Sequence, residues 1–370
     1  MGQRFFAGAG GLSLGFDQAG FDVRAAVELD TVHCAVHEYN FPSTKVISAS
    51  AAELSGNEIR ERAGLNSEQI DCVFGGAPCQ GFSLLLGQRV FDDPRNQLVL
   101  HFVRLVHELD AGSFVFENVK GFTVGKHKSF LKELVQAFDD AGYVCRLPWK
   151  ILNAAHFGTP QSRERFILMG VKKGQNLPEY PEPTTNAAGR PKLYPDLGYG
   201  PTCADAIGDL PDADTFESLR STDAVKTIRF GQPSEYAAEL RALTNDAWHY
   251  GYVREWEPNV LTSSARTEHT EISRRRFRET EIGAVEPISR FLKLPEAGVS
   301  NTLRAGTDGA RGAFSSPRPI HYLHSRCIPV REMARLHGFP DWFRFNKTKW
   351  HGARQIGNAV PPPLARVIAA

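Results

Sequence analysis

The first 171 residues alternate between short apolar runs and stretches with helical periodicity. The runs "DCVFGG" (71–76), "SFVFEN" (113–118) and "RFILMGV" (165–171) are separated by the helical stretches "NQLVLHFVRLVHEL" and "SFLKELVQAFDDAG". Short apolar runs bounded by turn residues indicate strands, and strands that alternate with helices indicate a sheet built from crossover connections. The pattern therefore predicts an α/β, Rossmann-like fold with a mostly parallel sheet and helices on both faces.

This rhythm stops after Val171. Residues 174–300 are rich in Pro, Gly, Asp and Arg and have weak periodicity, and a helical pattern returns from about residue 320. We therefore expect a catalytic and cofactor-binding domain at 1–174, a smaller irregular recognition domain at 175–300, and a return segment at 301–370 that completes the first domain.

The charge distribution points to an anionic partner. The net charge is only +1, but residues 261–370 contain 18 Lys and Arg against 9 Asp and Glu, whereas residues 1–260 contain 25 against 33. The densest basic run is "RRRFR", in which an aromatic residue interrupts the arginines as in many phosphate-contacting segments. We expect DNA contacts there, although a solvated helix face is an equally good interpretation of this run alone. The arginines are Arg274, Arg275, Arg276 and Arg278.

Cysteine usage and hydropathy exclude other classes. The six cysteines include no CxxC pair, no signal-like apolar segment opens the chain, and no run of eighteen apolar residues occurs. We expect a reduced, cytoplasmic protein without a metal site or a membrane span.

Glycines follow the first predicted strand. "FAGAGG" (6–11) places them where a strand, expected at 3–7, turns into a helix that ends near Gly20. Glu28 ends the next strand, where a carboxylate can bind ribose hydroxyls. A plain tight turn is the alternative, and Ser13 stands where a dinucleotide fingerprint would have its third glycine, which argues against NAD.

Reactive side chains follow the later strands. Cys79 in "GGAPCQGFS" and Glu117 in "FENV" both stand at the carboxyl ends of apolar runs, the edge where open α/β sheets bind ligands. Arg163 and Arg165 alternate into a strand, so we expect both on one face. A lone Cys is more often a small core residue, and two arginines can be surface charges. Their joint position at strand ends favours a reactive site.

These segments together resemble the DNA cytosine-5 methyltransferase family of the bacterial restriction-modification type. In chain order, the resemblance is carried by "FAGAGG", "ELD" (28–30), "GGAPCQGFS", "DDPRNQL", "FENV", "QSRER", "REMARLHGFPD" and "RQIGNAVPPPLA". It covers the chain except for roughly residues 175–300. The resemblance implies methyl transfer from S-adenosylmethionine to C5 of a cytosine in double-stranded DNA, by an enzyme that we expect to act as a monomer.

The resemblance also implies residue roles. Cys79 is the expected nucleophile, Glu117 the partner of the cytosine N3 edge, and Arg165, helped by Arg163, the partner of the base O2. The cofactor is expected to contact Phe6, Gly8, Gly10, Gly11, Glu28, Leu29, Pro78, Asn358 and Val360. The loop 81–93 is expected to close over the DNA, and the DNA contacts expected near it are Gln80, Ser83 and Arg89.

Two positions depart from the family pattern. Ser50 stands nearest to an expected acid, which puts the usual bond to the adenine amino group in doubt, and the chain stops at Ala370, where relatives often carry a longer helix. Three alternatives remain: a tRNA methyltransferase with the same residues, an inactive regulatory subunit, and an NAD oxidoreductase. The long segment 175–300 favours DNA over RNA, and Cys79, Glu117, Arg163 and Arg165 together argue against the other two.

Overall fold

A computed structural model of the chain describes residues 2–77, 94–123, 127–244, 256–307 and 315–370. The chain divides into two compact units, which are described separately below. The first consists of Met1–Leu152 and Glu164–Pro181, and the second of Asn153–Arg163 and Glu182–Ala370.

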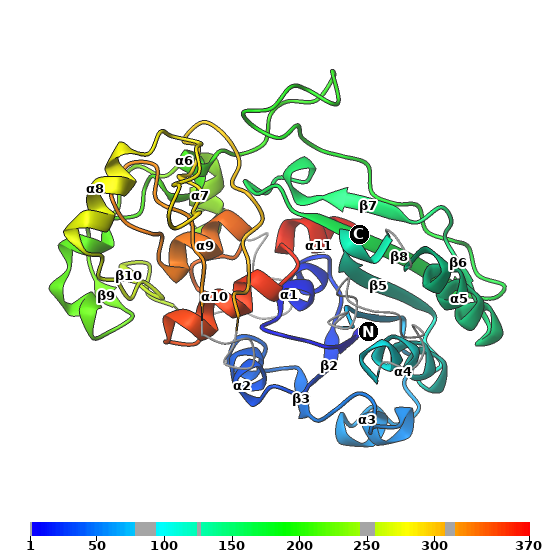
Figure 1. Cartoon of the computed structure of the whole chain (residues 1–370). Helices are drawn as coiled ribbons and strands as arrows, with labels where there is room; N and C mark the ends of the chain where they lie inside the picture. Colours follow the sequence, from blue (N-terminus) through cyan, green and yellow to red (C-terminus); the bar gives the residue numbers. More distant parts are fainter. Residues whose placement is uncertain (1, 78–93, 124–126, 245–255, 308–314) are drawn as a thin grey trace. The chain divides into compact units, whose positions relative to one another are not determined.

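The first unit is built on one twisted sheet (Figure 1). Its strands lie in the order β3-β2-β1-β4-β5-β8-β6, and β7 pairs with β8. The strands β1 to β5 run parallel, whereas β8 is antiparallel to β5 and to β6. The predicted mostly parallel sheet is confirmed. The strands are β1 (Gly2–Phe5), β2 (Val23–Glu28), β3 (Lys45–Ser48), β4 (Cys72–Gly75), β5 (Ser113–Val119), β6 (Tyr143–Cys145), β7 (Lys150–Asn153) and β8 (Glu164–Lys172).

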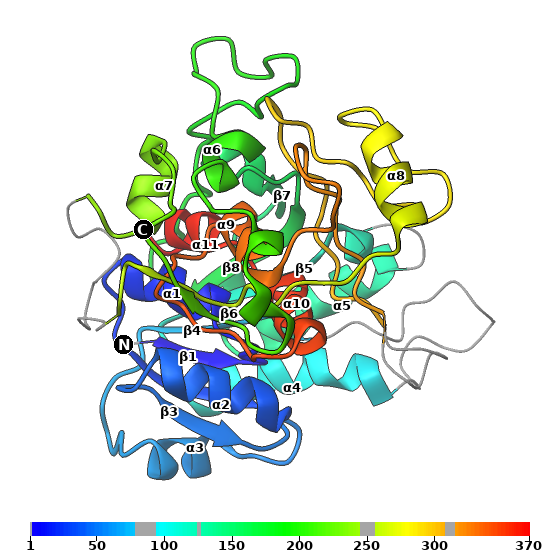
Figure 2. The same cartoon turned by 90° about the vertical axis from the view of Figure 1, so that its left-hand side faces the viewer.

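Helices cover both faces of this sheet. Val73 and Phe74 are neighbours in β4 and therefore point to opposite faces. Phe74 stacks on Phe16 of α1, with ring centroids 3.7 Å apart, whereas Val73 belongs to the cluster that contains α4 residues. Figure 2 shows β3 at one edge, beside α2 and α3. The helices are α1 (Gly11–Gln18), α2 (Thr31–Asn40), α3 (Gly56–Arg62), α4 (Pro94–Glu108) and α5 (His127–Asp140), with the 3-10 turn η2 at Lys120–Thr123.

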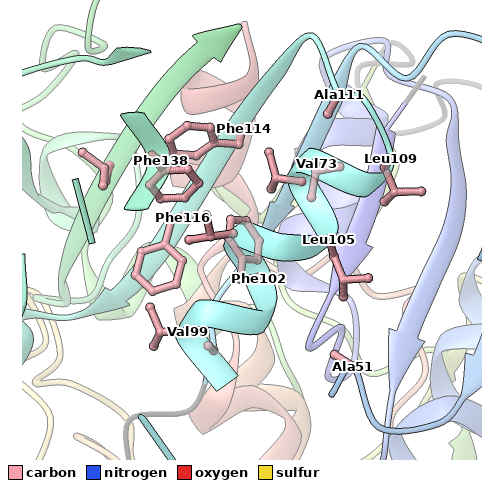
Figure 3. Close-up of a cluster of buried hydrophobic side chains, with 14 of the residues drawn as sticks. Ala51, Val73, Val99, Phe102, Leu105, Leu109, Ala111, Phe114, Phe116 and Phe138 are labelled. Carbon is pink, nitrogen blue, oxygen red and sulfur yellow. The ribbon is translucent and has the colours of Figure 1, made fainter. Parts of the chain in front are cut away.

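Aromatic rings hold β5 against α4 and α5 (Figure 3). Phe114 of β5 stacks on Phe138 of α5 with centroids 3.8 Å apart, and Phe116 meets Phe102 of α4 edge-on at 5.3 Å. These rings are buried, and burying a large apolar side chain contributes about 1.5–3 kcal/mol. This packing fixes the strand whose last residues include Glu117.

The second unit has short helices joined by irregular chain, as its weak periodicity predicts. Within the described part of the whole chain, no helix has the length and apolar character needed to cross a membrane. The elements of the second unit are η3 (Ala154–His156), α6 (Cys203–Ile207), η4 (Ala213–Thr215), η5 (Glu217–Arg220), β9 (Val225–Lys226), α7 (Glu235–Leu240), β10 (Val260–Leu261), α8 (Glu271–Glu279), α9 (Val330–His337), α10 (Lys349–Asn358) and α11 (Pro362–Ala369).

Buried ion pairs tie the end of the chain to the middle of this unit. Arg335 of α9 lies 3.1 Å from Asp209, and Arg326 lies 2.8 Å from Asp212. Residues 301–370 lie in the same compact unit as 182–300. The sequence pattern assigned them to the first domain, and the predicted domain boundaries remain a prediction.

Candidate active site

Glu117 and Arg165 form an ion pair within the first unit. Arg165 Nε lies 2.8 Å from Glu117 Oε1, and the two side chains are 9% and 12% exposed. Glu117 is paired in register with Ile167 of β8, two residues from Arg165, so both charged side chains lie on the same face of the sheet. The structure thus brings together two of the residues predicted to contact the base.

The end of β4 lies directly beside this pair. Gly76 follows β4, and a Cβ atom built there would collide with Glu117 Oε2, so only glycine allows this close approach. Asn118 Nδ2 donates a hydrogen bond to the carbonyl of Ala77 at 3.1 Å. Both contacts fix the backbone two and three residues before Cys79. The predicted residues Pro78, Cys79, Gln80, Ser83 and Arg89, and the predicted closing loop, lie outside the described residues.

The five described cysteines are unsuited to nucleophilic chemistry, because all are buried. Burial raises the pKa of Cys72 and Cys145 to about 12 and that of Cys327 to about 11, and it raises the pKa of Cys34 and Cys203 as well. The reactive species is the thiolate, which such shifts suppress at neutral pH. Cys79 is the one cysteine of the sequence to which this argument does not apply.

Arg163 contacts different groups from Arg165. It is fully buried within the second unit, and its guanidinium donates to three backbone carbonyls: Leu303 at 2.9 Å, Gly357 at 2.6 Å and Ala359 at 2.9 Å. Arg163 directly precedes β8, which begins at Glu164. These bonds indicate a positioning role.

Arg163 holds the carbonyls on both sides of Asn358, a predicted cofactor residue. Asn358 ends α10 and is exposed, whereas Val360, predicted for the same pocket, is buried. Gln161 and His337 complete the support: Gln161 Nε2 and His337 Nδ1 are 2.9 Å apart, and His337 Nε2 lies 3.1 Å from the Ala359 carbonyl. The sequence analysis missed these two residues, although both stand inside quoted motifs.

The predicted cofactor loop of the first unit has an unusual backbone. Phe6, Gly8 and Gly10 have φ angles of 55°, 51° and 112°, in the region that favours glycine. Such a conformation is costly for Phe6, and strain of this kind clusters at ligand sites. Gly11 begins α1, so the loop runs into a helix N-terminus, as the sequence predicts.

Glu28 closes this loop from the end of β2. Its Oε2 accepts from Gly8 N at 2.7 Å, and its Oε1 accepts from Leu29 N and Asp30 N at 3.0 Å. Leu29 is 68% exposed, so its apolar side chain is accessible to a planar ring. Ser50 has only a hydroxyl, which accepts from Ala52 N at 3.3 Å. A nucleoside with an apolar face and ribose hydroxyls fits this set of residues.

The arginines of α8 are mostly paired within the protein. Arg274 lies 2.7 Å from Asp214, Arg276 3.6 Å from Glu286, and Arg278 3.7 Å from Glu271. Phe277 is buried beside Ile320 and Cys327, so it is a core residue and does not interleave with phosphate contacts. Arg275 alone of this run is exposed without a partner among the described residues. In the same residues, no cluster of His, Cys, Asp and Glu could hold a metal ion.

Known proteins match this chain in sequence over its whole length. The profile of the family described as C-5 cytosine-specific DNA methylase matches residues 3–370. The Type II methyltransferase M.XorII of Xanthomonas oryzae pv. oryzae is 55% identical over 368 residues, which cover 100% of this chain and 83% of that protein.

Solved structures agree with this result. A crystal structure described as a DNA modification methyltransferase encoded within a prophage (E. coli) has a TM-score of 0.79 and 33% identity, covering 100% of this chain and 97% of that chain. DNMT2 of Spodoptera frugiperda, at 17% identity and a TM-score of 0.54 over 99% of this chain and 97% of its own, shares the fold alone. The full-length family match and the high identity lead to one conclusion: the chain belongs to the C-5 cytosine-specific DNA methylases and is a DNA (cytosine-5-)-methyltransferase with the fold of that family.

Proposed function

We propose that this enzyme methylates a cytosine that is flipped out of a specific sequence in double-stranded DNA, through a covalent bond between Cys79 and C6 of the base. The observation that carries the proposal is the Glu117–Arg165 ion pair, 2.8 Å long, against the chain that leads from β4 to Cys79. A base inside a duplex cannot reach such a site, and flipping it out costs a few kcal/mol.

Each residue would have a distinct role in this chemistry. The Cys79 thiolate attacks C6, and the electrons of the C5–C6 double bond move into the ring. Glu117 shares a proton with N3 and Arg165 donates to O2, so both stabilise the negative charge that the addition creates. After C5 has gained the methyl group, a base removes the C5 proton and the bond between Cys79 and C6 breaks.

We propose S-adenosylmethionine as the methyl donor, bound by the loop of Phe6, Gly8, Gly10 and Gly11. When bound, this cofactor supplies an electrophilic methyl group on a sulfonium. Glu28 would hold the ribose and Leu29 would cover the adenine, which fits the exposed apolar surface of Leu29. Pro78, Asn358 and Val360 are proposed as further contacts.

We further propose that the enzyme belongs to a Type II restriction-modification system and acts as a monomer. We also propose that residues 175–300 recognise the target sequence in the DNA. The 55% identity to M.XorII, whose name states Type II, supports the first point. The exposed Arg275 of α8 supports the proposal that this segment contacts DNA. The other predicted contacts of α8 are paired with acidic residues in the protein and would have to exchange those partners for phosphate; they are Arg274, Arg276 and Arg278.

A duplex with 5-fluorocytosine at the target tests the covalent step. Addition of Cys79 and methyl transfer proceed, but fluorine does not leave as a cation, so a protein–DNA band that survives denaturing electrophoresis should accumulate only with S-adenosylmethionine. Cys79→Ser should give no band, because a neutral hydroxyl is a far weaker nucleophile than a thiolate. Glu117→Gln should give it slowly, since an amide does not supply a proton.

Genomic DNA and tRNA, offered to the wild type with a labelled cofactor, are the substrate controls. A stable adduct with Cys79→Ser, or none with active wild type, would contradict the proposed chemistry. Label in tRNA instead of DNA would contradict the proposed substrate.

A further inference from the structure

A short hairpin follows α8 in the second unit. Gly283 N donates to the Lys293 carbonyl at 3.0 Å, and Lys293 N donates back to the Ala284 carbonyl at 2.9 Å. Glu286 N donates to the Phe291 carbonyl at 2.8 Å, and Val285 is bridged to Leu292 in antiparallel fashion. Residues 283–293, called the hairpin below, therefore form a short hairpin with one antiparallel bridge and its tip at 287–290.

The tip is held in one conformation by a buried carboxylate. Glu286 is 1% exposed, and its Oε2 accepts from Ser289 N at 2.5 Å. Burial opposes the ionisation of Glu286, but hydrogen bonds from Ser289 and Ile288 and the charge of Arg276 outweigh it, so the pKa of Glu286 is lowered. Arg290 N closes the turn on the Glu286 carbonyl at 2.9 Å.

The hairpin is also fixed to α8 by side-chain contacts. Lys293 is buried, and its Nζ donates to the carbonyls of Arg278 at 3.3 Å and Thr280 at 2.9 Å, which lie at the end of the helix. Arg276 of α8 lies 3.6 Å from Glu286. Because several independent contacts join them, α8 and the hairpin form one rigid platform.

This rigid tip presents an arginine and an apolar side chain to solvent. Ile288 is 69% exposed. Arg290 is exposed, and its guanidinium has no partner among the described residues. Arg290 also has a φ angle of 60°, a strained conformation for a side chain other than glycine. The buried carboxylate thus holds a turn whose strained Arg290 directs its guanidinium away from every partner in the described residues.

We propose that the hairpin reads the DNA target in the major groove, with Arg290 bound to the O6 and N7 atoms of a guanine and Ile288 against a neighbouring base edge. The inference rests on the proposed function and adds the residues that determine specificity. The tip of a narrow hairpin can enter the major groove, and a bidentate arginine on guanine is the commonest specific contact there. Arg275, which is exposed on α8, would contact phosphate.

Two substitutions at one position separate base reading from charge. Arg290→Gly removes the side chain and suits the φ of 60°, so the hairpin keeps its shape. Arg290→Lys keeps the charge but loses the paired donors of the guanidinium. Each full-length variant is incubated with S-adenosylmethionine and genomic DNA that lacks 5-methylcytosine, and the methylated sites are read by bisulfite sequencing.

Both Arg290 variants should relax the preference at one and the same base pair of the target, by about tenfold or more. The control Arg275→Ala should slow methylation at every site, weaken its salt dependence and leave the target sequence unchanged. An unchanged target with Arg290→Lys or with Arg290→Gly would overturn the assignment of the hairpin. Absence of 5-methylcytosine with the wild type would overturn the proposed function itself.

Discussion

At the scale of single residues, two arginines that are two positions apart have different environments. Arg165 faces the carboxylate of Glu117, whereas the guanidinium of Arg163 donates to the backbone carbonyls of Leu303, Gly357 and Ala359. A guanidinium can serve several carbonyls at once because it carries five donors in a fixed plane. We therefore assign Arg163 to the support of Asn358 and Arg165 to the base.

The same substitution at both positions tests this division. Arg163→Lys should lower the free energy of unfolding by about 2–4 kcal/mol, because the three donors of an ammonium lie on one nitrogen and cannot reach carbonyls that two separate guanidinium nitrogens serve. Arg165→Lys should change it by less than about 1 kcal/mol but slow methyl transfer on the order of 100-fold. Urea unfolding and single-turnover methylation measure the two effects. Equal stability of the two variants would remove the distinction.

At the scale of elements, the active site depends on how closely the ends of β4 and β5 approach. Gly76 makes this approach possible, since its missing Cβ leaves the space that the Glu117 carboxylate fills. Asn118 adds a side-chain bond to the Ala77 carbonyl beside it. The pair of strands therefore positions both the carboxylate and the chain that leads to Cys79.

Gly76→Ala should displace Glu117 and slow methylation on the order of 100-fold, because misplacing a catalytic group by about 1 Å has that effect. The free energy of unfolding should fall by only about 1–3 kcal/mol, as for other overpacked sites. Gly121→Ala is the matched control, because a Cβ there meets nothing closer than Val119 Cγ2 at 4.0 Å. Full activity of Gly76→Ala in a rate assay would show that the Glu117 position is not critical.

At the scale of the whole molecule, charge pairs hold the second unit together. Asp209, 1% exposed at its side chain, lies 3.1 Å from Arg335 and 3.3 Å from Arg241. Arg335 is also bound to both oxygens of Asp341. Removing one member of such a buried network leaves a desolvated charge without its partner.

Asp209→Asn should therefore lower the free energy of unfolding of the full chain by about 3–5 kcal/mol. Glu257→Gln, which removes the exposed pair Lys226–Glu257, should change it by less than about 1 kcal/mol. Chemical denaturation of both variants gives the comparison, and similar values would contradict the structural role of the network.

A chimera that exchanges residues 175–300 for a relative's segment should transfer the target sequence only if the new segment keeps Asp209 and Asp212.

In the first unit, short-range sequence patterns were enough to predict which strand ends carry the residues of the candidate site. Local patterns were sufficient there: apolar runs ended at Glu28 and near Glu117, glycines followed β1, and β4, β5 and α1 formed where periodicity placed them. Because the carboxyl ends of parallel strands meet at one edge of a sheet, these short-range signals were enough to predict that Glu117 lies near the chain leading to Cys79.

Only the tertiary structure decided which charged groups meet. Arg163 and Arg165 have the same residue type and neighbouring positions, but one is bound to carbonyls that lie 140 to 196 residues away and the other to Glu117. Nor did any sequence pattern distinguish the paired Arg274 from the exposed Arg290, or join Arg335 to Asp209. The physical reason is that hydrophobic periodicity records which side of a strand or helix is buried, whereas an ion pair depends on the spatial position of one distant side chain and leaves no local pattern.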